Sequence, residues 1–270
     1  MKTTLKLTTT LVLFSTLLGS TLAFAAGESD QATTKGKVSF KAGGTDPEGK
    51  PEVNPPSHPD EPGQIIDPEG EPGGETGIGG PLSLDFAPNL DFDIHDISTQ
   101  DKEYFAKLQR AKLVPEGEEQ APENAEVKDV PNFAQVTDKR GTGEGWSLSV
   151  TQKGQLKTED GKVLKGAKIT FANPTIMSEV EDEAQTPEVS YDGSALLADE
   201  EIEAATPLMT ASEQKGMGQY QIKFGTLLDE TKSAVESVKL SVPGKTVKYA
   251  ADYSTELEWN LASGPSNTEQ

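Results

Sequence analysis

Two short stretches of the sequence share one aromatic frame. The chain has only two tryptophans, Trp146 and Trp259, and each is followed by one polar residue and then a leucine, Leu148 or Leu261. Both triplets lie in runs of alternating apolar and polar residues, so each tryptophan falls on the apolar face of an expected strand. An indole ring there either stacks on the apolar face of a sugar or fills the core between two sheets. The alternation favours the core, although a groove between the sheets would allow both interpretations.

The run RGTGEG, from Arg140 to Gly145, superficially resembles a phosphate-binding loop. A dinucleotide-binding loop follows a strand and opens a helix, whereas this run leads directly into the strand of Trp146. The sequence therefore predicts a glycine-rich turn. We expect Gly141 and Gly145 to adopt backbone angles that other residues resist.

Cysteine and histidine, which often ligate metals or take part in catalysis, are scarce in this chain. The chain has no cysteine and only two histidines, His58 and His95. Asp91 and Asp93 share a face with His95, which would suit a hard cation, but a solvated polar face explains the same residues. Neither a Gly-x-Ser-x-Gly elbow nor a His-Glu-x-x-His motif occurs, and carboxylate pairs are inevitable among 45 acidic residues. We expect no catalytic residue, no metal and no cofactor, and hence a protein that is not an enzyme.

The first 25 residues have the order of a secretory signal peptide. Lys2 and Lys6 make a basic start, an apolar run follows from Leu11 to Leu18, and Ala23–Ala25 fits the small-x-small pattern read by a signal peptidase. The apolar run is too short to span a bilayer. We expect residues 1–25 to be removed on export, and we expect no membrane insertion of the remaining chain.

Charge and cysteine content narrow the class of protein further. The net charge is −21, and loss of Lys2 and Lys6 with the signal peptide brings the mature chain to −23. Nucleic acid and anionic lipid are poor partners for such a charge. An exported chain without cysteine is typical of Gram-positive bacteria. With no cysteine to carry a lipid and no hydrophobic tail, we expect the protein to be secreted and held noncovalently at the cell wall or cell surface.

Residues 45–80 differ in composition from the rest of the chain. This stretch holds eight prolines, nine acidic residues and one lysine. Prolines at this density disfavour helices and sheet ladders, and like charges extend the chain. The sequence therefore predicts a flexible, disordered insertion at 45–80. It separates an N-terminal segment at 26–44, with one short strand around Val38 and Phe40, from a main body at 81–270.

From residue 81 onward, short runs of alternating apolar residues recur between turn residues. This pattern predicts an all-β fold, an antiparallel β-sandwich-like domain. The expected strands are PLSLDFAP at 81–88, NLDFDIHDIS at 89–98, PNFAQVTD at 131–138, GWSLSVTQ at 145–152, GAKITFAN at 166–173, GQYQIKFG at 218–225, SVKLSVPG at 237–244 and STELEWNLA at 254–262. Two stretches are expected to hold short helices instead, one around Tyr104–Ala111 and one in ALLADEEIEAA at 195–205.

Three blocks of the sequence resemble the WxL-domain cell-surface proteins of low-GC Gram-positive bacteria. VTDKRGTGEGWSLSV at 136–150 resembles the proximal block of that family, and VKLSVPGKTVKYAADYSTELEWNLASGP at 238–265 resembles its distal block. GGPLSLDFAPNLDFDIHDIS at 79–98 resembles the stretch that follows the family's acidic, proline-rich insertion. The resemblance extends from about Lys35 to Pro265. One Trp-x-Leu triplet alone carries no information, whereas two in their proper blocks are specific.

The resemblance implies a function that composition does not supply. Proteins of this family attach noncovalently to the peptidoglycan of the cell wall, and they are thought to assemble with other exported surface proteins, some with roles in adhesion. Carried over residue by residue, Trp146, Leu148, Trp259 and Leu261 are the positions of the cell-wall-binding motif. The alternative is a structural or adhesive module that a partner surface protein holds in place. The sequence does not separate these two functions.

Overall fold

The computed structural model describes residues 35–68, 79–196 and 204–264. The chain divides into two units, Met1–Ser39 and Phe40–Gln270, and every strand of the described residues belongs to the second unit. The strand expected around Val38 and Phe40 is absent from these residues, so that prediction is wrong. The predicted signal peptide at 1–25 lies outside the described residues.

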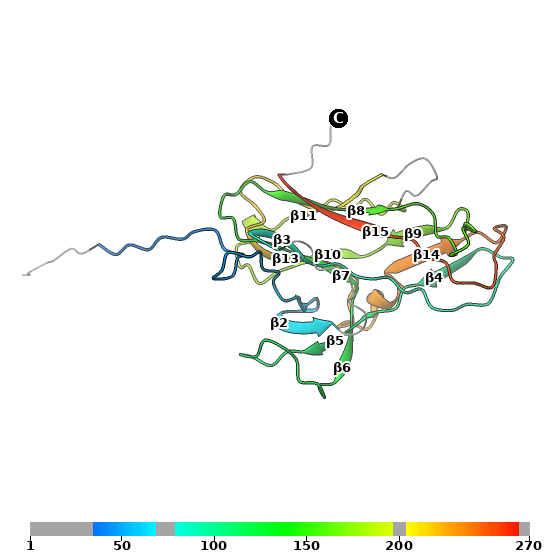
Figure 1. Ribbon diagram of the computed structural model, residues 1–270, viewed down its shortest axis with the longest axis horizontal. Helices are drawn as coiled ribbons and strands as arrows, with labels where there is room; N and C mark the ends of the chain where they lie inside the picture. Colours follow the sequence, from blue (N-terminus) through cyan, green and yellow to red (C-terminus); the bar gives the residue numbers. More distant parts are fainter. Residues whose placement is uncertain (1–34, 69–78, 197–203, 265–270) are drawn as a thin grey trace, which may run out of the picture. The chain divides into compact units, whose positions relative to one another are not determined.

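The second unit is an antiparallel β-sandwich, which confirms the predicted fold class (Figure 1). One four-stranded sheet has the order β10 (Pro174–Met177), β13 (Gly218–Phe224), β7 (Phe133–Asp138) and β3 (Leu82–Phe86). The facing sheet has the order β11 (Glu188–Val189), β12 (Thr206–Ala211), β8 (Trp146–Gln152) and β15 (Leu257–Ser263). At one edge of the sandwich β10 lies close to β11, and at the other edge β3 lies close to β15.

A third sheet closes one end of the core. Its order is β4 (Lys102–Phe105), β14 (Val238–Val242) and β9 (Lys168–Phe171). Two short 3-10 helices, η1 (Glu183–Gln185) and η2 (Ser233–Glu236), are the helical elements of the described residues. Alternate residues of β14 and β9 point into the same apolar cluster as those of β8, β12, β13 and β7. One continuous core therefore joins three sheets, and period-2 alternation along each strand supplies it.

The central strand β7 is buried on both faces. Ala134 and Val136 contribute to the main core, while Phe133 points to the opposite side and stacks on Phe86 with ring centroids 4.5 Å apart. Phe133 and Phe86 belong to a second, smaller core that includes Ile66 and Ala111. A small fourth sheet covers this second core. Its order is β1 (Ser57–His58), β2 (Glu61–Pro68), β5 (Gln109–Leu113) and β6 (Val127–Val130).

Part of the stretch predicted as a flexible insertion is folded, because β1 and β2 lie within residues 45–80. Pro62 and Pro68 stand near the two ends of β2, where a missing N–H removes few ladder hydrogen bonds. The composition of the stretch is not sufficient to keep it unpaired. Residues 69–78 of the same stretch lie outside the described residues.

A buried ion pair fixes this segment on the main sheet. The Asp60 carboxylate accepts hydrogen bonds from Lys223 Nζ at 2.5 Å, from Thr226 Oγ1 at 2.9 Å and from the Leu227 backbone N–H at 2.9 Å. Both charged side chains are buried, so the pair is shielded from water, and three donors satisfy the carboxylate. Asp60 and Lys223 are far apart in sequence. Local composition therefore could not reveal the contact.

Two further expectations are corrected. The helix expected around Tyr104–Ala111 is replaced by β4 and β5, because pairing with β14 and with β2 and β6 overrides local helix propensity. The strand expected at 89–98 is an irregular segment, in which Asp93 has a φ of 63° that interrupts extended backbone. The helix expected at 195–205 falls mainly outside the described residues.

Candidate functional site

The two Trp-x-Leu triplets lie on neighbouring strands of one sheet. β15 pairs with β8 along its whole length, which places Leu261 opposite Leu148 and Trp259 opposite Val150. Residues directly opposite each other in a ladder share a face. The four motif residues therefore form one continuous apolar surface on the inner side of the sheet, although the two triplets are more than one hundred residues apart in the sequence.

Trp146 and Leu148 are core residues. Both are 0% exposed. The Trp146 indole Nε1 donates a hydrogen bond to the Gly216 carbonyl at 2.9 Å, and its ring lies 6.4 Å from the ring of Tyr220. Gly216 has a φ of +79°, and a Cβ there would lie 2.5 Å from Nε1, so the backbone is shaped around the indole. A wall polymer has no access to either motif residue in this fold.

The glycine-rich turn before β8 is a structural connection. Gly141 and Gly145 have φ angles of 68° and 73°, which confirms the prediction made for both. Arg140 donates to the Asp138 carboxylate from Nε at 3.0 Å and from Nη2 at 2.8 Å, and Nη1 donates to Ser263 Oγ at 2.6 Å. The hydrogen bonds to Asp138 raise the pKa of Arg140 above its ordinary value, so its charge is permanent. Arg140 thereby ties the end of β7 to the end of β15.

Trp259 lies on the wall of a groove, in contrast to Trp146. The groove has a volume of about 1890 Å³ and runs between the inner face of β15, the segment 248–256 that precedes it, and the segment 87–97. Trp259 is half-buried, and its ring centroid lies 6.3 Å from that of Phe171 at the floor of the core. Leu261 is also half-buried but packs against the core rather than lining the groove. Of the four motif residues, only Trp259 lines the groove.

Aromatic side chains gather in this groove, although the chain as a whole is only 6% aromatic. The lining includes Phe92, His95, Tyr104, Tyr249, Tyr253 and Trp259. The hydroxyl of Tyr253 accepts a hydrogen bond from the Tyr249 backbone N–H at 2.9 Å, and Lys162 Nζ lies 4.4 Å from the centre of the Tyr249 ring. His95 stacks on Tyr104 with ring centroids 4.1 Å apart. The rings are therefore held in place before any ligand arrives.

The segment 87–97 forms the opposite wall, and Lys107 holds it. Lys107 Nζ lies 2.9 Å from the Asp91 carboxylate and 3.1 Å from that of Asp93, and the Lys107 backbone N–H donates to the Asp91 carbonyl at 2.7 Å. The hydrogen bond from Lys107 keeps the pKa of each carboxyl below its ordinary value. His95 Nε2 lies 2.6 Å from the Phe92 carbonyl. Among the described residues no group of His, Asp and Glu is arranged to hold a metal ion.

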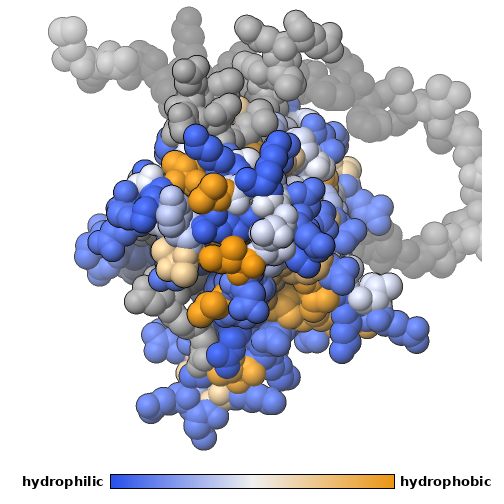
Figure 2. All heavy atoms as spheres, turned by 90° about the vertical axis from the view of Figure 1, so that its right-hand side faces the viewer, coloured by the Kyte–Doolittle hydropathy of each residue, from blue (hydrophilic) through white to orange (hydrophobic). Residues whose placement is uncertain are grey.

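Hydrophobic side chains also reach the surface at the end of the molecule that lies to the right in Figure 1. Figure 2 shows them there as separate patches among hydrophilic residues. The large apolar side chains that stand exposed in 87–97 and 245–250 are Ile94, Ile97, Val247 and Tyr249. Ile94 is 91% exposed. Apolar surface separated by charges suits a ligand with both apolar faces and polar edges better than a purely apolar one.

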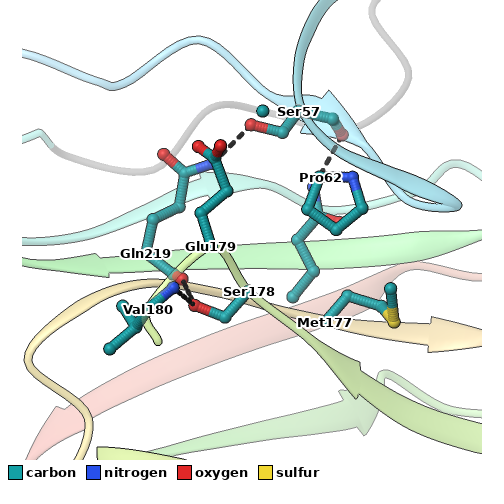
Figure 3. A pocket seen from close by; sticks show the side chains of 9 residues that line it. Ser57, Pro62, Met177, Ser178, Glu179, Val180 and Gln219 are labelled. Atoms are coloured by element: carbon teal, nitrogen blue, oxygen red, sulfur yellow. Dashed lines mark hydrogen bonds between the residues drawn. The ribbon is translucent and has the colours of Figure 1, made fainter. Parts of the chain in front are cut away.

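A second, smaller pocket of about 250 Å³ lies between β2 and the end of β10 (Figure 3). Its polar groups already bond one another: Gln219 Nε2 donates to Ser57 Oγ at 2.6 Å, Ser178 Oγ donates to the Gln219 carbonyl at 2.6 Å, and the Val180 N–H donates to Ser178 Oγ at 3.0 Å. The hydrogen bond between Gln219 and Ser57 joins the small sheet to the sandwich. The groove beside β15 is therefore the better candidate site.

One of three comparisons with known proteins gives a match. Residues 27–265 match the family model described as "WxL domain surface cell wall-binding". Because the match covers most of the chain, the protein belongs to the WxL-domain family of surface cell-wall-binding proteins. Neither the comparison with curated proteins nor the comparison with solved structures gives a match. No helix of the described residues is long and apolar enough to cross a membrane.

Sequence reasoning reached some of these site residues and missed others. It placed Trp146, Leu148, Trp259 and Leu261 on apolar faces, which the structure confirms. It did not distinguish the two tryptophans or identify Tyr104, whose segment was expected to be helical. Tyr249 and Tyr253 both lie within the distal block, in a chain with only five tyrosines. This clustering is the feature of the sequence that could have indicated an aromatic site there.

Proposed function

We propose that this protein is exported by its N-terminal signal peptide and binds the peptidoglycan of a Gram-positive cell wall directly and noncovalently. The groove beside β15 is the proposed binding site. The observation that supports it most is the unequal placement of the two tryptophans. Trp146 is fully buried in the core, whereas Trp259 lines a groove whose lining also includes Tyr249 and Tyr253.

The chemistry of the groove suits a sugar chain. Pyranose rings present apolar C–H faces that pack on aromatic rings, while their hydroxyl and amide groups need polar partners at the edges. Trp259 and Tyr253 offer aromatic surface, and the lining also includes Lys153, Lys157 and Glu258. Contacts of this kind act at short range. They therefore tolerate the net charge of −23 that the chain has after loss of Lys2 and Lys6, a charge that works against long-range attraction to an anionic wall.

Several aromatic side chains of the groove already hold fixed positions, which favours binding. The hydrogen bond between the Tyr249 N–H and the Tyr253 hydroxyl and the stack of His95 on Tyr104 fix ring positions in the free protein. A ligand that meets fixed rings loses less conformational entropy on binding than one that must order them. We also propose that binding proceeds without cleavage of the wall.

Cosedimentation with purified peptidoglycan, stripped of teichoic acid and protein, tests the proposal. Residues 26–270 should pellet with it, and Trp259→Ala should pellet much less while keeping a cooperative thermal unfolding transition. Glu179→Gln serves as the matched control, because Glu179 lines the smaller pocket. It should pellet like the unmodified protein.

Two results would overturn the proposal. If the unmodified protein stays in solution, direct peptidoglycan binding is wrong and attachment through a partner surface protein replaces it. If Trp259→Ala and the control pellet equally well, the groove is not the site. Release of soluble wall fragments during the incubation would contradict binding without cleavage.

A further inference from the structure

The outer edge of β15 carries backbone groups that have no backbone hydrogen-bond partner among the described residues. The Glu256 carbonyl accepts from the Lys153 N–H at 2.8 Å, and the Gly264 N–H donates to the Gly145 carbonyl at 3.0 Å, so both residues direct their backbone groups toward β8. In an antiparallel ladder this direction alternates along the strand. The backbone N–H and C=O groups of Leu257, Trp259, Leu261 and Ser263 therefore point away from β8. β15 is the last strand of its sheet, and β8 is its one partner in the described sheets.

β15 lacks the usual protection of an edge strand. It has seven residues in unbroken register with β8, and it contains no proline and no lysine. The other edge strands of the described sheets have between two and five residues. β10 begins with a proline, β3 carries a bulge, and the Leu196 N–H and the Tyr191 hydroxyl contact β9. Among the described sheets, the longest edge strand is thus the one with the second Trp-x-Leu triplet, and its register with β8 has no bulge.

The four outward-pointing residues are symmetric about Asn260. A second copy of β15 running antiparallel, with Asn260 opposite Asn260, places Trp259 opposite Leu261 and Leu257 opposite Ser263. Each of these is a pair that exchanges both N–H···O bonds, so this register engages every outward-pointing group of both strands. We propose that the protein forms a two-fold symmetric dimer through β15 in this register. This inference goes beyond the proposed wall binding and does not depend on it.

The side chains fit the same register. On the exposed face, Glu258 stands opposite Ala262 of the second copy, so no two like charges oppose each other. On the inner face, apolar Trp259 meets apolar Leu261. A register shifted by two residues would leave Leu257 or Ser263 without an opposite outward-pointing residue in β15. The backbone pairing therefore selects the register centred on Asn260, and the charges are compatible with it.

The symmetry has a consequence for the groove. A two-fold axis perpendicular to the sheet keeps the same face of β15 on the same side in both copies. The two Trp259 side chains would then lie on one side of an eight-stranded sheet. If each groove binds the wall, a dimer engages a polymeric ligand at two points and gains avidity without a new contact.

Sedimentation velocity over a wide range of protein concentration, with a charge pair at position 262, tests the proposal. Ala262 is exposed, so the monomer tolerates either charge. Ala262→Glu would oppose Glu258 twice across the two-fold axis, and Ala262→Lys would form two attractive pairs. We expect the dimer dissociation constant to rise by about two- to thirty-fold in the first variant and to fall by a similar factor in the second.

Thr175→Glu and Thr175→Lys control for net charge, because Thr175 is an exposed residue of β10. Both should dimerise like the unmodified protein. A chain that remains monomeric at every concentration, including as Ala262→Lys, would refute the dimer. If the protein dimerises but neither Ala262→Glu nor Ala262→Lys changes the dissociation constant, the proposed register is wrong. Sedimentation velocity tests the dimer, and pelleting of the monomeric Ala262→Glu variant with peptidoglycan tests wall binding. The failure of one proposal can therefore be distinguished from the failure of the other.

Discussion

Replacement of each tryptophan in turn separates a stabilising role from a binding role. Trp146→Ala removes a fully buried indole, which costs about 3–5 kcal/mol of unfolding free energy. It also leaves the Gly216 carbonyl without its 2.9 Å hydrogen bond, which adds about 1 kcal/mol or more. A total of about 4 kcal/mol or more corresponds to a fall of roughly 8–16 °C in the unfolding midpoint of a domain this size.

Trp259→Ala should cost about 2 kcal/mol, because that ring is already partly exposed on an edge strand. Thermal and urea unfolding followed by far-ultraviolet circular dichroism measures both effects without relying on tryptophan emission. Peptidoglycan pelleting is then compared at a temperature where both variants remain folded. Folded Trp146→Ala should still pellet, whereas Trp259→Ala should not. A larger loss of stability in Trp259→Ala than in Trp146→Ala would refute the assignment of the two rings.

Three further predictions concern stability. Gly216→Ala should lower the unfolding free energy by about 1–3 kcal/mol in a urea titration, because a Cβ there would lie 2.5 Å from Trp146 Nε1 at a φ of +79°; an unchanged midpoint would contradict the close packing. Asp60→Asn should cost about 3–5 kcal/mol in the same titration, because it leaves the Lys223 ammonium buried without its counterion, and a neutral result would mean that the pair is solvated. Burial raises the pKa of Asp60, but the hydrogen bonds from Lys223 and its neighbours outweigh burial and keep that pKa below its ordinary value. The resulting stabilisation is present above about pH 4 and is lost as the pH falls through the lower folded pKa, so Asp60→Asn should flatten the acid limb of stability against pH.

Local sequence pattern predicted much of the sandwich. Alternating apolar residues mark β3, β7, β8, β9, β13, β14 and β15, because each of these strands has one face in the core. The same periodicity failed at 89–98, where the alternate residues border a groove instead of a neighbouring strand. It also missed β1 and β2, whose position depends on the contact of Asp60 with distant Lys223.

The candidate site was less predictable than the fold. Identical Trp-x-Leu frames gave no sign that β8 is a central strand and β15 an edge strand of the same sheet, because strand order depends on pairing between distant segments. That difference decides which tryptophan reaches a ligand. The groove wall formed by Tyr104, Lys107 and Asp91 likewise exists only after β4 has paired with β14.

Hydrogen exchange with solubilised peptidoglycan fragments tests the proposed site most directly. Binding in the groove predicts that backbone amides at 89–97 and 249–259 exchange more slowly when the fragments are present, and that Trp259→Ala abolishes this protection. Protection confined to other segments, or no protection at saturating fragment concentration, would contradict peptidoglycan binding through the groove beside β15.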